Sequence, residues 1–152
     1  MTIDIIVRVE GQRYALPLSK VNRVVRAVEV TPVPTAPDIF MGVIDVGGDV
    51  MPVVDLRLRL RLERRPVDVG DCMVVARQAS DRRLVLPVDA VLGIANDLAA
   101  PVDAGGTPLH PDCIDRLLCD ADGLILELDL DALITADQYA ALSALPADHA
   151  AT

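Results

Sequence analysis

The stretch Gly42–Val54 reads GVIDVGGDVMPVV, and it decides the fold class of this chain. Two runs of mainly β-branched residues, 42–46 and 50–54, flank a turn that contains Gly47 and Gly48. Valine and isoleucine favour strands, and glycine supplies the positive φ angles that a tight hairpin turn requires. The stretch therefore predicts a β-hairpin.

Further hairpins are predicted on both sides of this one. Strands are expected at 3–8 and 14–18 around a turn at Gly11 and Gln12, at 72–76 and 84–88 with 89–94 continuing the pair, and at 116–119 and 124–128 around a turn at 120–123. For residues 21–28 the apolar spacing is helical but the β-branched composition favours a strand, and periodicity alone does not decide. The chain is predicted to be all-β.

Other segments interrupt the strands. Thr31–Pro37 contains three prolines, so we expect an extended and exposed connector. Residues 56–62 alternate Leu and Arg as a strand would, but Asp55 can cap a short helix, and we favour a helical turn over 56–60. Residues 97–113 are rich in Pro, Gly and Asp and are expected to form a long surface loop.

The end of the chain is predicted to be helical. Thr135–Gln138 matches a capping box and opens a helix expected over 136–145. That helix can dock Tyr139, Leu142 and Leu145 on the body of the protein. The tail that follows is expected to fray.

Composition excludes several classes of partner. The chain has 152 residues, the length of one domain, with 14 basic and 23 acidic residues and a net charge of -9. This charge repels nucleic acid and anionic lipid. Asp4, Arg8 and Glu10 interrupt any secretion signal, and no apolar run reaches the ~20 residues that span a bilayer. We expect a cytoplasmic protein with no nucleic-acid partner and no direct membrane insertion.

The three cysteines are expected to be free thiols. Cys72, Cys113 and Cys119 are odd in number, and the chain shows no export signal, so a disulfide framework is not predicted. A zinc site would combine them with His110. That spacing lacks the paired C-x-x-C that presents two thiolates to one ion, so no metal site is predicted.

A basic cluster follows the central hairpin. Its members are Arg57, Arg59, Arg61, Arg64 and Arg65. Two interpretations stay open: a solvated face of the protein, or a patch for an acidic partner.

No catalytic constellation is visible in the sequence. The serines lie in no G-x-S-x-G elbow, and Gly47-Gly48 lacks the lysine and helix of a phosphate loop. Asp45, Asp49 and Asp55 flank the central hairpin, where aspartate commonly caps turns. We predict that the chain is not an enzyme.

Several separated motifs carry a resemblance to a known family. They are Tyr14–Leu18 (YALPL), Val33–Pro37 (VPTAP), Met41–Ile44 (MGVI), Val50–Arg57 (VMPVVDLR) and Asp122–Ile134 (DGLILELDLDALI). In their order and spacing they resemble the CheW-like family of chemotaxis coupling proteins. The likeness covers about residues 3 to 135.

The resemblance implies a fold. Two five-stranded SH3-like barrels would pack together, with short helical turns and a C-terminal helix. The CheW-like domain would occupy 1–135, with subdomains 14–66 and 67–135 and with the N-terminal strand 3–9 pairing with the second. Residues 136–152 would be the C-terminal helix and tail.

The resemblance also implies a function without chemistry and without a cofactor. Such an adaptor bridges the cytoplasmic tip of chemoreceptors and the regulatory domain of a CheA-type histidine kinase, in an array that serves flagellar or type IV pilus motility. The expected partner-binding residues are Pro34, Ala36, Pro37, Gly42, Asp45, Gly47, Gly48, Asp49, Pro52, Asp55 and Arg57. The alternative is a divergent barrel domain that binds a small ligand or metal outside a receptor array.

The central turn departs from the family pattern. The family usually has Asn-x-Arg-Gly, whereas this chain has Asp45-Val46-Gly47-Gly48. Asp45 can accept backbone hydrogen bonds as asparagine would. Gly47 lacks the guanidinium to which a receptor or array contact is normally attributed.

Overall fold

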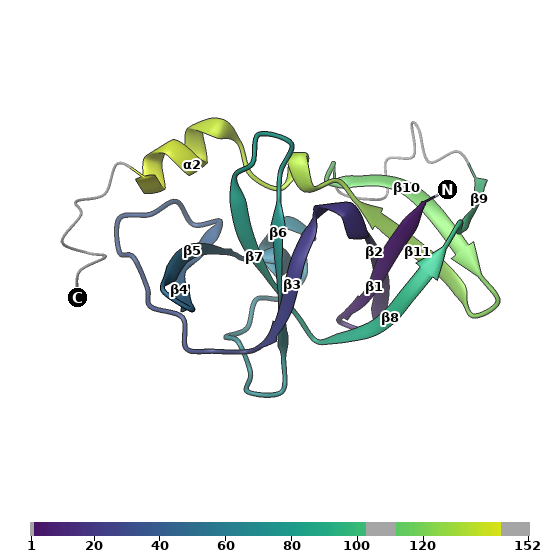
Figure 1. Ribbon diagram of the computed structural model, residues 1–152, viewed down its shortest axis with the longest axis horizontal. Coiled ribbons are helices and arrows are strands. Elements are labelled where there is room, and N and C mark those ends of the chain that lie inside the picture. Colours follow the sequence, from purple (N-terminus) through teal and green to yellow (C-terminus); the bar gives the residue numbers. More distant parts are fainter. Residues whose placement is uncertain (1, 103–111, 144–152) are drawn as a thin grey trace.

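The computed structural model describes residues 2–102 and 112–143, which form mainly strands (Figure 1). The strands are β1 (Ile3–Val9), β2 (Gln12–Pro17), β3 (Val21–Arg26), β4 (Phe40–Val46), β5 (Asp49–Val54), β6 (Cys72–Arg77), β7 (Arg83–Val88), β8 (Ala90–Asn96), β9 (Ala99–Val102), β10 (Ile114–Asp120) and β11 (Gly123–Leu128). The helical elements are η1 (Leu18–Lys20), α1 (Leu56–Arg59), η2 (Leu130–Ala132) and α2 (Ala136–Ser143).

The strands form two sheets that lie side by side along the molecule (Figure 1). Within the described residues, the first sheet has the order β8-β1-β2-β11-β10-β9 and the second has the order β3-β6-β7-β5-β4. In the first sheet β2 pairs in parallel with β11. This pairing brings a strand near the start of the chain beside a strand near its end. In the second sheet β5 runs parallel to β7 through the pair Val53 and Val85.

Three hydrophobic clusters hold this arrangement together. The largest lies between the sheets and combines first-sheet residues such as Val7 and Leu16 with second-sheet residues such as Leu84 and Leu86. Smaller clusters belong to the second sheet, around Met73, and to the first, around Leu118 and its neighbours. Full burial of one such side chain contributes about 1.5–3 kcal/mol, so the shared cluster makes the two sheets one cooperative body.

Most local predictions are confirmed. The four predicted hairpins are present, and the undecided segment 21–28 contains strand β3. Asp55 caps α1 by accepting a hydrogen bond from the Leu58 amide at 3.1 Å, as predicted. The connector Thr31–Pro37 is mostly irregular, although Thr31 forms an isolated bridge with Val43.

The capping box of α2 is also confirmed. The Gln138 amide donates to Thr135 Oγ1 at 3.1 Å, and the Thr135 amide donates to Gln138 Oε1 at 2.9 Å. Tyr139 and Leu142 pack against the large core cluster. Leu145 and the predicted tail lie outside the described residues.

One prediction of organisation is wrong. Residues 97–113 were expected to be loop, but Ala99–Val102 is strand β9, paired with β10, and this gives the first sheet a sixth strand. The division into subdomains 14–66 and 67–135 stays a prediction; in the structure β2 joins the first sheet, while β6 and β7 join the second. Strand β1 pairs with both β8 and β2, as expected.

Candidate protein-docking surfaces

The turn of the β4–β5 hairpin is exposed, and its backbone is capped by an aspartate side chain. Asp45 Oδ1 accepts a hydrogen bond from the Gly48 amide at 2.8 Å, which confirms the predicted capping role of this aspartate. Gly47 and Gly48 have φ angles of 59° and 94°, in the left-handed region that glycine tolerates at no steric cost. A Cβ added at either glycine would meet no atom within 4 Å. The outer edge of the turn is therefore open to a partner.

An apolar side chain lies beside this turn. Val50 is 48% exposed and stands directly opposite Asp45 in the β4–β5 register. Next to it, Asp49 forms an exposed ion pair with Arg83 at 3.5 Å. A partly exposed apolar residue within a polar rim is typical of protein interfaces. We refer to residues 45–50 as the hairpin-turn surface.

The proline connector does not join this surface. Pro34 is exposed, Ala36 and Pro37 are half-buried, and the Pro37 carbonyl accepts from the Phe40 amide at 3.0 Å, at the start of β4. The hairpin turn lies at the other end of β4, about 20 Å away at about 3.3 Å per residue. The predicted partner-binding residues are therefore divided between two places.

Two other predicted partner-binding residues are buried for structural reasons. Gly42 has a φ angle of 148°, and a Cβ at this position would overlap the backbone carbonyl of Thr31. The proline connector and β4 also form two backbone hydrogen bonds of 2.9 Å, both between Thr31 and Val43. Pro52 is buried within β5. Gly42 thus allows the connector to close against β4.

Asp55 and Arg57 were also expected at the partner-binding surface, but both residues are buried in the structure. Asp55 accepts from Arg64 Nε at 2.8 Å as well as from the amide that it caps. Arg57 donates to Glu10 and to Asp89, the latter at 2.7 Å. Burial lowers the pKa of Arg57, but its bonds to Glu10 and Asp89 outweigh that effect and raise it. These two residues stabilise the fold.

Four of the five arginines of the basic cluster form ion pairs within the protein: Arg57, Arg59, Arg64 and Arg65. Arg65 donates to both carboxylate oxygens of Asp71 at 2.9 Å, which raises the pKa of this arginine. Arg59 donates to the backbone carbonyls of Leu133 and Ala132 at 2.9 and 2.6 Å. Most of the cluster therefore pairs within the protein. Long-range pairing of this kind has no signature in a single sequence.

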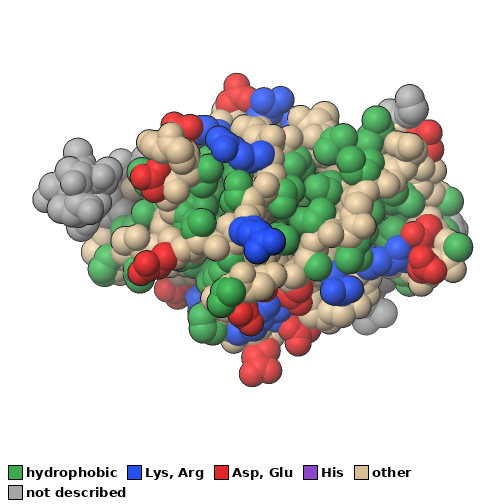
Figure 2. All heavy atoms as spheres, turned by 60° about the horizontal axis from the view of Figure 1, so that its bottom comes forward, with side chains coloured by type: hydrophobic (Ala, Val, Ile, Leu, Met, Phe, Trp, Pro, Cys, Tyr) green, Lys and Arg blue, Asp and Glu red, His purple; other side chains and the backbone are tan. Residues whose placement is uncertain are grey.

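Exposed apolar side chains also lie on an edge strand of each sheet. Val24 on β3 is exposed, as are Leu92 and Ile94 on β8. Each of these strands is the outermost strand of its sheet. Figure 2 shows one face of the molecule, on which hydrophobic side chains lie exposed among basic and acidic ones. We refer to Val24, Leu92 and Ile94 as the edge-strand surface.

The predicted free thiols agree with the structure. Cys72 and Cys119 are half-buried and Cys113 is buried, where burial raises the pKa of its thiol. Among residues 2–102 and 112–143, no three His, Cys, Asp or Glu side chains lie where they could hold a metal ion together. His110, the remaining member of the alternative zinc set, lies outside the described residues.

The fold and its surfaces define a class of protein. Two small β-sheets share one core and display an exposed hairpin turn and exposed apolar side chains on edge strands, which are features of a protein-docking module. The family model described as "CheW-like domain" matches residues 5–138, and the chain belongs to this family. CheW-like proteins are non-catalytic scaffolds of chemotaxis, in agreement with the prediction that the chain is not an enzyme.

Individual relatives are consistent with this assignment. "Chemotaxis protein CheW" of Rhizobium meliloti is 34% identical over 87 residues, a match that spans 57% of this chain and 56% of that protein. "Probable chemotaxis protein CheW" of Rhizobium etli is 24% identical over 84% of each chain. The scaffolding protein TtCheW from Thermoanaerobacter tengcongensis shares the fold, with a TM-score of 0.76 and 20% identity over 90% of this chain and 94% of its own.

The helices of the described residues are too short or too polar to cross a membrane.

Proposed function

We propose that this chain is a cytoplasmic adaptor that couples chemoreceptors to a CheA-type histidine kinase in a bacterial chemosensory array, serving flagellar or type IV pilus motility. An adaptor of this kind needs two docking surfaces that can be occupied at the same time. The observation that supports the proposal is the presence of two separate exposed apolar surfaces, the hairpin-turn surface and the edge-strand surface.

The hairpin-turn surface is assigned to the regulatory domain of the kinase. Its backbone is fixed by the Asp45 bond to Gly48, so little conformational entropy is lost when a partner binds. Val50 offers an apolar contact of limited area, and Asp49 and Arg83 offer polar contacts around it. A small contact of this type suits a reversible, transient interaction.

The edge-strand surface is assigned to the receptor tip. A helix of the receptor would bury an apolar stripe, and Val24, Leu92 and Ile94 are the apolar side chains that the outermost strands offer to it.

Size-exclusion chromatography with both partners tests this assignment. Wild-type protein is expected to co-elute with the kinase regulatory domain and with a receptor-tip helical hairpin, separately and as a ternary complex. An Ile94→Glu variant is expected to lose the receptor hairpin and to keep the kinase domain. Loss of both partners in this variant, with its fold intact by circular dichroism, would contradict two separate surfaces.

A further inference from the structure

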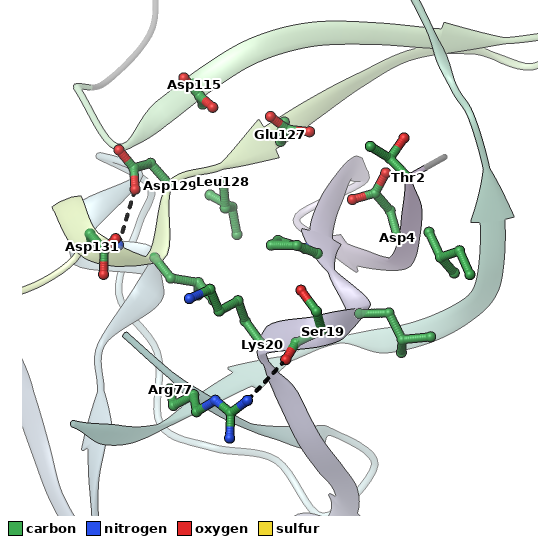
Figure 3. Close-up of a pocket in the computed structure, with 14 residues that line it drawn as sticks. Thr2, Asp4, Ser19, Lys20, Arg77, Asp115, Glu127, Leu128, Asp129 and Asp131 are labelled. Atoms are coloured by element: carbon green, nitrogen blue, oxygen red, sulfur yellow. Dashed lines mark hydrogen bonds between the residues drawn. The ribbon is translucent and has the colours of Figure 1, made fainter. Parts of the chain in front are cut away.

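A cavity of about 570 Å³ opens between the start of β1, the turn η1 and the segment that follows β11 (Figure 3). Its apolar wall includes Ile3, Leu18 and Leu128. Its polar lining is mainly acidic, with Asp4, Asp115, Glu127, Asp129 and Asp131 against Lys20 and Arg77. It is separate from the hairpin-turn surface, since none of residues 45–50 lines it.

The decisive residue of this cavity is Asp4. Its exposed fraction is 3%, and its carboxylate points into the cavity (Figure 3). Across the described part of the chain, no group donates a hydrogen bond to this carboxylate, and no basic side chain forms an ion pair with it. A buried carboxylate without a protein partner is costly, because no protein donor compensates for its lost contact with bulk water.

Neighbouring carboxyl groups increase this cost. Asp4 has a raised pKa because of burial and because of the negative charge on Glu127. Asp115 also has a raised pKa, from burial and from its hydrogen bond to Glu127. Arg116 pairs with Glu127 at 3.0–3.1 Å, and its positive charge offsets only part of the rise in the pKa of Asp4 and of Asp115. Negative charge therefore accumulates at one end of the cavity.

The other polar groups do not neutralise this end. Asp129 and Asp131 accept from the backbone amides of Asp131 and Ala79 at 3.0 and 2.8 Å and serve as caps. Lys20 and Arg77 lie across the cavity from Asp4 in Figure 3. Arg77 donates to the Ser19 carbonyl at 3.5 Å.

We propose that this cavity binds a monovalent organic cation, an alkylammonium or alkylguanidinium group, with its charge against Asp4 and its alkyl stem against Leu18 and Leu128. A cation at Asp4 supplies the missing hydrogen-bond donors and relieves the repulsion from Glu127 and Asp115. The apolar wall suits an alkyl stem better than it suits a hydrated ion.

The cation can come from a free small molecule or from a lysine or arginine side chain of a bound protein. Both sources present the same ammonium or guanidinium group, so the experiment includes free cations and an arginine-containing peptide. The probes are n-butylguanidinium, n-butylammonium, the neutral analogue 1-butanol, and an acetylated and amidated Gly-Arg-Gly peptide. Binding is followed at pH 7 by amide chemical shifts in two-dimensional NMR spectra of the full chain.

The expected result is saturable shifts at Asp4, Leu18 and Leu128 with the cations, and binding of 1-butanol weaker by about tenfold or more. Asp4→Asn keeps the size of the side chain and should weaken cation binding by about tenfold, whereas Asp122→Asn, in the exposed β10–β11 turn, should leave it unchanged. Tighter binding of the peptide than of butylguanidinium would identify a protein side chain as the ligand, and equal binding would identify a free amine or guanidine.

Equal shifts with 1-butanol, shifts remote from the cavity, or no shift with any cation would overturn the proposal. The comparison of cations with 1-butanol uses wild-type protein alone, so it decides the question even if Asp4→Asn does not fold.

Discussion

Arg57 Nη2 lies 2.7 Å from Asp89 Oδ1, and this contact joins the two halves of the protein. Arg57 belongs to α1, which follows the last strand of the β4–β5 hairpin, and Asp89 links β7 to β8. The same guanidinium contacts Glu10 in the β1–β2 turn of the first sheet. Asp89 in turn accepts from Arg65 at 2.9 Å and from the Glu10 amide at 2.9 Å. A polar network thus supports the shared hydrophobic core.

Removal of Arg57 is expected to destabilise the protein. Arg57→Met leaves Asp89 and Glu10 without their main partner, and removal of one member of a fully buried pair costs about 3–5 kcal/mol. Because Asp89 is partly exposed and keeps Arg65, we expect a loss of about 2 kcal/mol in the free energy of unfolding, measured by urea denaturation.

Arg83→Met is the matched control for this change. Arg83 pairs with Asp49 at 3.5 Å with both side chains largely exposed, so its removal should cost about 0–1 kcal/mol. Equal losses for the two variants would show that the Arg57 network does not hold the halves together.

Asp89 should make the stability of the protein depend on pH. Burial favours the neutral form, but the Glu10 amide, Arg57 and Arg65 outweigh burial and hold the pKa of Asp89 below its usual range. A depressed pKa stabilises the folded state above the unfolded pKa of about 4, and this contribution is lost as the pH falls through the folded pKa. The difference in unfolding free energy between wild type and Asp89→Asn should therefore be largest near pH 7 and shrink below about pH 4. A difference that stays constant from pH 7 to pH 3 would contradict this role.

Gly42 is expected to tolerate no side chain. Gly42→Ala would place a Cβ against the Thr31 carbonyl at a φ of 148°, so we expect a loss of roughly 3 kcal/mol or more. Gly47→Ala meets open space at a φ of 59° and should cost about 1–2 kcal/mol. Thermal or urea unfolding of the two variants measures the contrast. Similar losses would mean that the close approach of the connector is unimportant.

The strands could be predicted because their signals are local. Runs of apolar residues on both sides of short polar or glycine-containing turns indicated each hairpin, and the capping box at Thr135 indicated α2. Strand β9 was missed because Ala99–Val102 reads AAPV, which has little strand propensity and contains a proline; as an edge strand it tolerates both.

The roles of charged residues could not be predicted, because burial depends on contacts distant in sequence. Arg57 and Asp89 are separated by 32 positions, and no spacing rule relates them. Asp4 lies between Ile3 and Ile5 in the predicted strand 3–8, and nothing in this pattern indicates that its side chain is buried. Both faces of this strand are covered, because the shared core lies on one side and the smaller cluster of the first sheet on the other.

Gly47, which stands where the family usually has arginine, gives a separate prediction. Gly47→Arg should preserve the fold at a cost of about 1–2 kcal/mol, because the side chain would extend into open space. If the loss of arginine has specialised this chain, the variant should enter receptor–kinase arrays more fully than wild type, as measured by co-sedimentation. Unchanged incorporation would mean that this turn position does not determine assembly of the array.

Isothermal titration calorimetry with the regulatory domain of the cognate CheA-type kinase tests the central claim most directly. The account predicts saturable binding of the wild type, a loss of at least about tenfold in affinity for Val50→Glu on the hairpin-turn surface, and no change for Val69→Glu, which is 89% exposed elsewhere. No detectable heat at high micromolar concentrations, or equal binding by wild type and Val50→Glu, would contradict the claim that the hairpin turn docks the kinase.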